Sequence, residues 1–160
     1  MDRHRIGIIA DTHGLMRPEA LEALQGSELI VHAGDVGGPL ILEDLRAIAP
    51  VVAVRGNIDR EHWAQALPER EAIEWAGISL YVIHDIKELA LDPAAAGFSV
   101  VISGHSHRPS IRHRSGILLL NPGSAGPRRF NLPVSVALIE VQDGTVEPRL
   151  IELKLALPQK

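Results

Sequence analysis

The stretch Ile6-Gly7-Ile8-Ile9-Ala10-Asp11-Thr12-His13-Gly14 holds the most informative pattern in the chain. Its first five residues are apolar or glycine, a composition typical of a strand that is buried on both faces of a sheet. An aspartate and a histidine follow where this strand would end. Because ligands of open α/β sheets bind at the carboxyl ends of the strands, the stretch predicts a buried strand that presents two polar side chains to a binding site.

The next two apolar runs repeat this arrangement, with helical segments between them. Residues 29–33 and 51–54 predict strands. Residues 18–24 and 39–48 each begin with proline and continue with apolar residues at helical spacing. Alternation of strand and helix is typical of right-handed crossovers in a parallel sheet, so the sequence predicts an α/β fold.

Helical spacing fades beyond about residue 117, and the rest of the chain is predicted to form strands. Residues 134–141 and 146–155 are apolar runs, and Asp143-Gly144 between them indicates a hairpin turn. We therefore expect a second, more antiparallel sheet from the C-terminal part. The chain has no internal repeat or flexible linker, so residues 1–160 are interpreted as a single domain.

Side chains that bind metals follow five of the predicted strands. They are Asp11, His13, Asp35, Asn57, His84, His105 and His107. The last three belong to the ends of the predicted strands 78–83 and 100–102. Glycine precedes three of the positions, which permits the close backbone approach that a tight cation site requires. Since three such ligands suffice for one ion, seven predict a site for two ions.

Each of these motifs also has an ordinary structural explanation. An aspartate after a strand often caps the next helix, and Gly56-Asn57 is frequently only a turn. Two histidines at a spacing of two, His105 and His107, have few structural uses after a buried strand. The ordered set of motifs, each behind a strand, favours the metal site over these alternatives.

Composition narrows the class of protein further. The chain has 160 residues, no cysteine and a formal net charge of −4. The lack of thiols excludes disulfides and thiolate ligands, and the acidic balance argues against general nucleic-acid binding. No stretch approaches the ~18 apolar residues of a membrane span, so a cytoplasmic protein without membrane contact is the default expectation.

With these residues assembled, the sequence resembles the calcineurin-like metallophosphoesterase superfamily, and within it the small bacterial and archaeal phosphodiesterases. The resemblance runs from Asp11-Thr12-His13 to Asn121-Pro122-Gly123-Ser124. It implies a four-layer αββα sandwich with a dinuclear site at one edge. It also implies a hydrolase that uses two divalent ions, most often Mn²⁺, with Fe, Ni or Zn²⁺ as alternatives.

The resemblance further implies how the ligands divide between the two ions. The first ion would be held by Asp11, His13 and His107. The second would be held by Asn57, His84 and His105. Asp35 would bridge the two ions.

Four polar residues receive additional expected roles. Asn57 and His105 are predicted to act in catalysis, Asn57 by touching a phosphate oxygen. His32 and Asp59 are expected to support the ligands from behind. For His32 a hydrogen-bonded core histidine is the alternative, and for Asp59 the alternative is a hydrogen bond within its own turn.

Two positions depart from the family pattern. Many members carry a histidine after Gly-Asn that helps to protonate the leaving group, whereas Ile58 cannot donate a proton. Weak activity on poor leaving groups is the expected consequence, which favours a diester over a monoester. The second departure is Asp85, where relatives often carry glycine. This extra carboxylate would either tune the affinity of the second ion or point to solvent and cap a helical turn that begins near Ile86, and the cap is the favoured interpretation.

The predicted reaction is hydrolysis of a small phosphodiester or nucleotide-like substrate by a hydroxide that bridges the two ions. Substrate contacts are expected from residues 61–74 and 126–132. A non-catalytic scaffold is the main alternative, because a eukaryotic sorting-complex subunit uses the same fold with a degraded metal site. A nuclease acting on polymeric DNA or RNA is a second alternative, and a homo-oligomer stays open.

Overall fold

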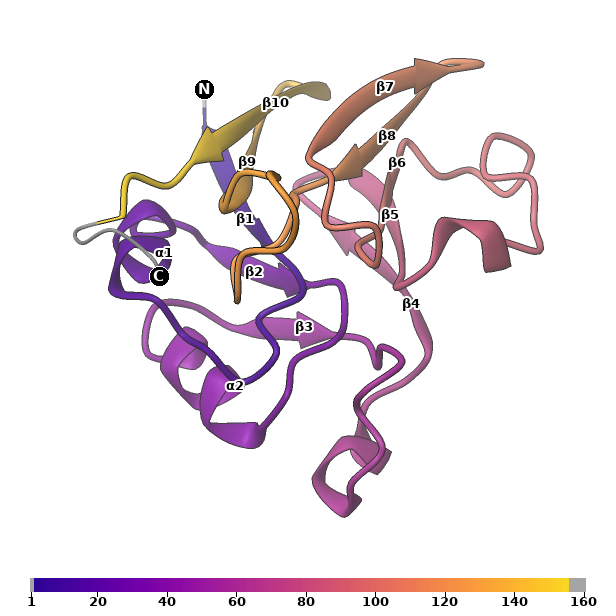
Figure 1. Ribbon diagram of the computed structural model, residues 1–160. Helices are drawn as coiled ribbons and strands as arrows, with labels where there is room; N and C mark the ends of the chain where they lie inside the picture. The colour runs from indigo at the N-terminus through magenta and orange to yellow at the C-terminus, as the bar shows by residue number, and fades with distance from the viewer. Residues whose placement is uncertain (1, 156–160) are drawn as a thin grey trace.

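Two five-stranded β-sheets form the computed structural model, which describes residues 2–155 (Figure 1). The first sheet has the strand order β10 (Thr145–Glu152), β9 (Ser135–Gln142), β1 (Arg3–Ile9), β2 (Leu29–His32) and β3 (Val51–Ala53). The second has the order β4 (Arg70–Trp75), β5 (Ile78–Ile83), β6 (Val100–Ile102), β8 (Ile117–Asn121) and β7 (Ser110–Arg114). Both sheets mix parallel and antiparallel neighbours, and the predicted α/β class is confirmed. Residue 1 and residues 156–160 of the expected domain lie outside the described residues.

The predicted alternation of strand and helix builds the parallel part of the first sheet. β1 pairs in parallel with β2, and β2 pairs in parallel with β3. The crossovers contain α1 (Pro18–Ala23) and α2 (Pro39–Arg46), each of which begins at the expected proline. Because the three strands run in the same direction, their carboxyl ends meet at one edge of the sheet.

The C-terminal hairpin forms as predicted, but its place in the fold corrects the sequence analysis. Asp143 and Gly144 have φ values of 51° and 78°, as a two-residue hairpin turn requires. The hairpin does not build a second sheet: β9 pairs with β1 and extends the first sheet. Nearly all of β9 is buried, so it needs neighbours on both edges and cover on both faces. The second sheet is formed by residues 70–121 instead.

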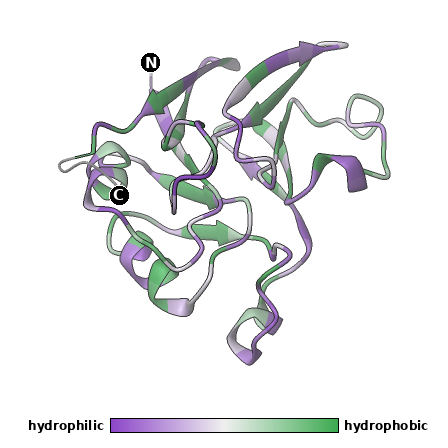
Figure 2. Cartoon of the chain, viewed as in Figure 1, coloured by the Kyte–Doolittle hydropathy of each residue, from purple (hydrophilic) through white to green (hydrophobic). Residues whose placement is uncertain are grey.

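Two strands of the second sheet were not predicted. These are β4 and β7, which occupy the two edges of that sheet. Much of β7 is exposed and charged, and Figure 2 shows hydrophilic colour along much of it. Charged residues protect an edge strand from pairing with another chain, and they also hide the apolar pattern by which a strand is recognised.

The main core lies between the two sheets. It includes residues from both, such as Ile8, Val31, Leu80 and Ile102, all fully buried. Helices α1 and α2 cover the outer face of the first sheet, where Leu24 and Leu45 are also fully buried. Three of the four expected layers are thus formed by helices and sheets.

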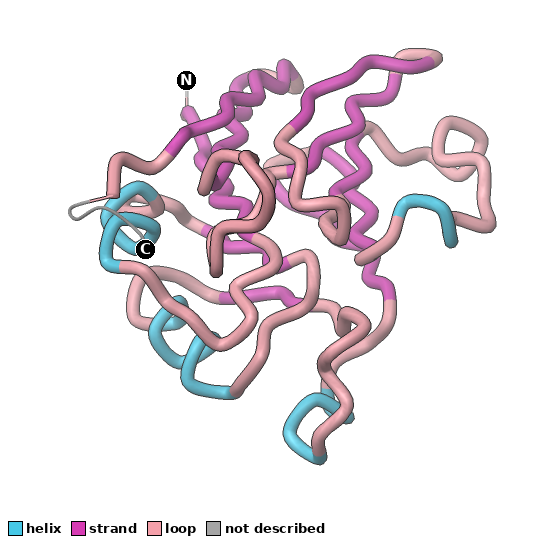
Figure 3. The backbone as a smooth tube through the Cα atoms, viewed as in Figure 1, coloured by secondary structure: helices cyan, strands magenta, loops and turns pink. Residues whose placement is uncertain are grey.

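The fourth layer contains no α-helix. The outer face of the second sheet is covered by the 3₁₀ turn η2 (Ile86–Glu88) and the following loop, which contribute Leu89, Leu91 and Phe98. A second 3₁₀ turn, η1 (His62–Ala66), extends away from both sheets (Figure 3). In residues 2–155, no helix has the length and apolar character needed to cross a membrane.

Candidate metal centre

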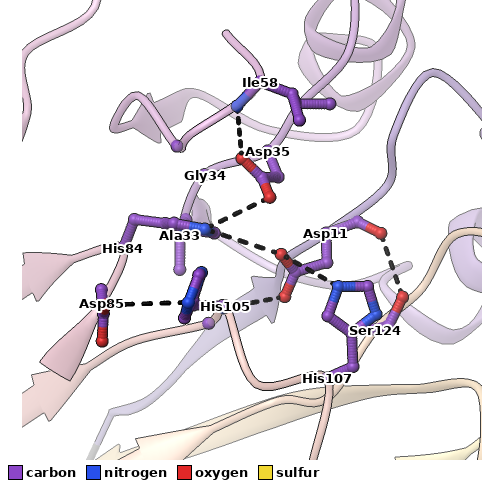
Figure 4. Close-up of polar contacts among 12 residues, drawn as sticks. Asp11, Ala33, Gly34, Asp35, Ile58, His84, Asp85, His105, His107 and Ser124 are labelled. Carbon is purple, nitrogen blue, oxygen red and sulfur yellow. Dashed lines mark hydrogen bonds and ion pairs between the residues drawn. The ribbon is translucent and has the colours of Figure 1, made fainter. Parts of the chain in front are cut away.

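The carboxyl ends of strands from both sheets adjoin at the predicted site (Figure 4). The first sheet supplies, after β1, β2 and β3, the residues Asp11, His13, Asp35 and Asn57. The second sheet supplies, after β5 and β6, the residues His84, His105 and His107. Two hydrogen bonds join the two sets: His84 Nδ1 donates to Ala33 O at 2.7 Å, and the backbone N–H of His105 donates to Asp11 Oδ2 at 3.1 Å.

Two carboxylates lie between three imidazole rings. Asp35 Oδ2 is 3.4 Å from His13 Nε2 and 3.3 Å from His84 Nε2. Asp11 Oδ1 is 3.7 Å from His107 Nε2 and 3.9 Å from the Nε2 atoms of both other histidines. Five of the seven predicted ligands are therefore brought together, with Asp35 between histidines of the two sheets.

The close ligands form two groups that could each hold a metal ion. Their ligand atoms lie within 4.8 Å of one another in the groups Asp11-His13-His107 and Asp11-Asp35-His84. The remaining two predicted ligands stand at the margin. Asn57 is exposed and lines a cavity of about 250 Å³ together with His84. The His105 ring packs edge-on against the His84 ring, with a centroid distance of 5.2 Å.

Buried polar atoms without hydrogen-bond partners show that these residues fit divalent cations. Among residues 2–155 they include Asp11 Oδ1, His13 Nε2, His84 Nε2 and His107 Nδ1. Each such atom costs about 1–3 kcal/mol if nothing satisfies it. Because His84 donates from Nδ1 to a carbonyl, its neutral form directs the Nε2 lone pair toward Asp35. A cation between this nitrogen and the carboxylate would satisfy both, and oxygen–nitrogen donors suit Mn²⁺, Fe²⁺, Ni²⁺ and Zn²⁺.

The electrostatics of the two carboxylates differ. Burial raises the pKa of Asp11 to about 7, even though the nearby His84 lowers it. Burial also acts to raise the pKa of Asp35, but the contacts with His84, Ile58 and His13 together outweigh burial and lower the pKa to about 2. Two neighbouring carboxylates that share one positive partner commonly separate in this way. The neighbouring side chains therefore do not supply enough positive charge for both carboxylates, and a bound cation would supply the rest.

Unusual backbone geometry is concentrated at the site. Nine non-glycine residues of the described chain have positive φ, and five of them are the predicted ligands Asp11, His13, Asp35, His105 and His107. Such conformations cost roughly 1–3 kcal/mol each and persist where the surrounding structure imposes them. The strand ends are thus bent to aim these side chains, which is typical of a functional site.

The glycines before the ligands are needed for close approach. A Cβ at Gly56 would clash with Asp35 Oδ1 and with the Asp35 backbone nitrogen. A Cβ at Gly34 would lie 2.6 Å from His84 Nδ1, and one at Gly104 would lie 3.0 Å from Asp11 Oδ2. At each glycine, the loop that carries one candidate ligand therefore passes close to the side chain of another, as was expected from the sequence.

Replacing Gly56 with alanine should therefore disturb the site more than the fold elsewhere. We expect Gly56→Ala to lower the free energy of unfolding by about 1–3 kcal/mol, as overpacking typically does, and to weaken Mn²⁺ binding because Asp35 must move. Gly38→Ala is the matched control, since a Cβ at Gly38 meets nothing within 4 Å and its φ of 169° is extended. Thermal unfolding and Mn²⁺ titration of both variants check this. Equal effects at the two positions would contradict it.

A fully buried histidine supports the β1 and β2 loops from behind. The Gly34 N–H donates to His32 Nδ1 at 3.1 Å, so the proton of the neutral ring is on Nε2 and donates to Thr12 Oγ1 at 3.0 Å. Thr12 then donates to Val36 O at 2.7 Å. Burial lowers the pKa of His32 to about 3, which keeps the ring neutral. Thr12 was not predicted, although it lies between two candidate ligands.

Asp59 joins the loops after β2 and β3. Its carboxylate accepts hydrogen bonds from the backbone N–H groups of Val36, Gly37 and Gly56 at 2.9–3.0 Å. Its side chain contacts the backbone next to Asp35 and next to Asn57. The bond to Gly56 lies within its own turn, and the other two hold the neighbouring loop as well.

The end of β8 and the segment that follows it form hydrogen bonds with the backbone of the ligand-bearing loops. Asn121 Nδ2 donates to Gly104 O at 2.9 Å, and Ser124 Oγ donates to Asp11 O at 3.0 Å. Gly126 lies so close to the Asp11 and Thr12 carbonyls that a Cβ would clash with them.

Comparison with known proteins gives the class of protein that this fold and site define. Residues 5–144 match the family model of the calcineurin-like phosphoesterase superfamily domain. A probable metallophosphoesterase of Methanothermobacter thermautotrophicus is 37% identical over 158 residues, which cover 91% of each chain. The chain therefore belongs to the calcineurin-like phosphoesterase superfamily, and the predicted resemblance is confirmed.

Further similarities extend to proteins named phosphodiesterases and to solved structures. A phosphodiesterase of Methanocaldococcus jannaschii is 25% identical over 138 residues, which cover 74% of this chain and 82% of that protein. The structure of an archaeal phosphodiesterase superposes with a TM-score of 0.78 at 22% identity, over 93% of this chain and 99% of that one. Vps29 of Entamoeba histolytica, complexed with zinc, gives 0.71 at 24% identity over 92% and 98%. At these identities the two structures show the shared fold alone.

Proposed function

We propose that this protein is a phosphodiesterase that hydrolyses a small phosphodiester with two divalent ions at the β-strand ends. The observation on which this proposal depends is the convergence of Asp11, Asp35 and three histidines with buried atoms that no protein group satisfies. The family membership supports phosphate-ester hydrolysis, and relatives named phosphodiesterases favour a diester. Mn²⁺ is the ion we propose first.

The proposed ligand assignment is the one that the family resemblance implies, and the geometry supports part of it. One ion would be held by Asp11, His13 and His107, which form one of the two close groups. The other would be held by His84, His105 and Asn57 at the margin of the site. Asp35 lies between His13 and His84, the place where a shared ligand must stand. When bound, the two ions supply Lewis acidity that lowers the pKa of water and neutralises charge at a phosphate.

The protein's own side chains would then orient the substrate. Asn57 is exposed and lines the same cavity as Arg55, Arg60 and His84, so its amide can donate to a phosphate oxygen. Arg60 offers positive charge to the remainder of an anionic substrate, whereas Arg55 forms an ion pair with Glu69 at 3.7 Å. The loop 126–132, where substrate contacts were expected, carries Arg129 as a further positive charge; burial and then this charge lower the pKa of His107. We propose that the substrate lies between the β3 loop and residues 126–132.

The leaving group receives no proton from the residue after Asn57. Ile58 is 46% exposed, and its backbone N–H donates to Asp35 Oδ1 at 3.1 Å. Its side chain therefore stands beside the proposed bridging ligand without an acidic group. We infer that the enzyme prefers esters whose alkoxide or phenolate leaves without protonation.

Hydrolysis of bis(p-nitrophenyl) phosphate by the Mn²⁺-loaded protein tests the proposal. We expect activity that requires Mn²⁺ and is abolished by EDTA. Elemental analysis of the active protein should give two ions per chain. A panel of natural diesters and nucleotides then narrows the substrate class. Protein that binds no metal and shows no metal-stimulated hydrolysis between about pH 6 and 9 would defeat the proposal and favour the scaffold alternative.

Ile58→His should extend the activity to poorer leaving groups. A general acid typically contributes about 10²–10⁴-fold, so we expect at least about a tenfold gain in kcat/KM for an alkyl diester and little gain for the p-nitrophenyl ester. Ile58→Leu is the control, because it preserves the backbone hydrogen bond to Asp35 and adds no acid. Rates for a series of esters with increasing leaving-group pKa provide the measurement. An equal gain for all leaving groups would contradict the prediction.

A further inference from the structure

Asp85 has two separate contacts, one for each carboxylate oxygen. Oδ1 accepts a hydrogen bond from the Lys87 backbone N–H at 3.0 Å and caps η2, as the sequence analysis predicted. Oδ2 faces the other way and lies 3.7 Å from His105 Nε2 (Figure 4). A cap requires only one oxygen. The second oxygen is therefore free to act on the histidine.

This contact determines which nitrogen of His105 faces the site. Nε2, at the outer end of the ring, faces Asp85, while the backbone N–H of His105 donates to Asp11 Oδ2. Nδ1 is the ring nitrogen nearer to that backbone, and the ring packs against His84. With Nε2 directed to a carboxylate, Nδ1 is the nitrogen left for an ion.

The His105 side chain needs a partner to hold this orientation. It is 43% exposed, whereas those of His84 and His107 are each 6% exposed. An exposed imidazole can rotate about its side-chain bonds, and each rotation would remove Nδ1 from the site. The Asp85 side chain is only 20% exposed and is anchored by the hydrogen bond from the Lys87 N–H, so it can hold the more exposed His105 ring in place.

We propose that Asp85 is a positioning residue that holds His105 toward the second ion and so sets the affinity for that ion; this rests on the proposed function, in which His105 is a ligand. A carboxylate beside the outer nitrogen keeps the proton on Nε2, orients the ring and makes Nδ1 a stronger donor. At 3.7 Å the contact is longer than a hydrogen bond, so the carboxylate acts on the neutral ring through its charge. Loss of such an outer partner typically weakens metal binding by about 10–100-fold.

Stepwise Mn²⁺ binding to Asp85→Asn tests the proposal. The amide keeps an oxygen for the η2 cap but loses the charge that faces His105. We expect the second ion to bind about 10–100-fold more weakly by calorimetric titration, with the first ion unchanged. Activity lost at low Mn²⁺ should return as Mn²⁺ is raised, and the melting temperature of metal-free protein should equal that of the wild type.

Glu88→Gln is the matched control. Glu88 is exposed and lines the same cavity as Asp85, so its replacement removes one negative charge from that wall without touching His105. Wild-type affinity for the second ion in Glu88→Gln, with weakened affinity in Asp85→Asn, supports the proposal. Equal affinities in Asp85→Asn and the wild type, or equal losses in both variants, would overturn it. A wild-type chain that binds no second ion would instead refute the proposed function, and the positioning role with it.

Discussion

Replacing Asp35 with asparagine is expected to lower kcat for an activated phosphodiester at least about 10³-fold, which corresponds to roughly 4 kcal/mol of transition-state stabilisation. The Asp35 carboxylate faces His13 and His84 from opposite sheets, with nitrogen–oxygen distances of 3.4 and 3.3 Å. A neutral amide cannot be shared between two cations as a carboxylate can. Losing the shared ligand should therefore weaken the binding of both ions. Water would then be activated less well, because its activation depends on the ions.

The same replacement should leave the fold intact. Asparagine keeps an oxygen for the hydrogen bond from the Ile58 N–H, and the loss of the charge contact with His84 affects only the strand ends. We expect the metal-free variant to melt within a few degrees of the wild type. Asp44→Asn, on the exposed face of α2, removes the same charge far from the strand ends and should retain full activity. Substantial Mn²⁺-dependent activity in Asp35→Asn would show that Asp35 is not the bridging ligand.

Saturation with Mn²⁺ is expected to raise the melting temperature by roughly 5–10 °C. A ligand at about 100 times its dissociation constant adds about 2.7 kcal/mol to the free energy of unfolding. For a domain of this size each kcal/mol raises the melting temperature by about 2–4 °C. The stabilisation comes from the same buried atoms, Asp11 Oδ1 and His84 Nε2 among them, that lack partners in the protein.

Thermal unfolding with and without Mn²⁺ measures this effect, and EDTA should reverse it. Asp35→Asn serves as the internal comparison, because its shift should be much smaller while its fold is preserved. Zn²⁺, Ni²⁺ and Fe²⁺ measured in parallel rank the ions that the oxygen–nitrogen ligands accept. If none of these ions stabilises the wild-type protein, the strand ends do not form a cation site.

The α/β alternation and the candidate ligands could be predicted because they depend on local pattern. A buried parallel strand such as 29–33 is an apolar run interrupted only by His32, and the aspartate that follows it at position 35 is visible at once. The edge strands β4 and β7 could not be found in this way, since their charged residues interrupt the pattern. Thr12 was missed for a related reason: its hydrogen bond joins it to His32, a contact across the sequence that spacing does not reveal.

Asp85 shows the limit of local reasoning at a single residue. Its cap of η2 involves a partner two positions away and was predicted from sequence. Its contact with His105 joins residues twenty positions apart, and only the packing of β5 beside β6 brings them together.

The strands that carry the ligands, the ligand-type residues and the family could be predicted from the amino-acid sequence, because these depend on residue type and short-range periodicity. Tertiary structure alone decided that the C-terminal hairpin completes the first sheet and that Asp35 lies between histidines of different sheets. The physical reason is that pairing between strands and packing between sheets are set by burial of a shared core. That burial is a property of the whole chain rather than of any segment.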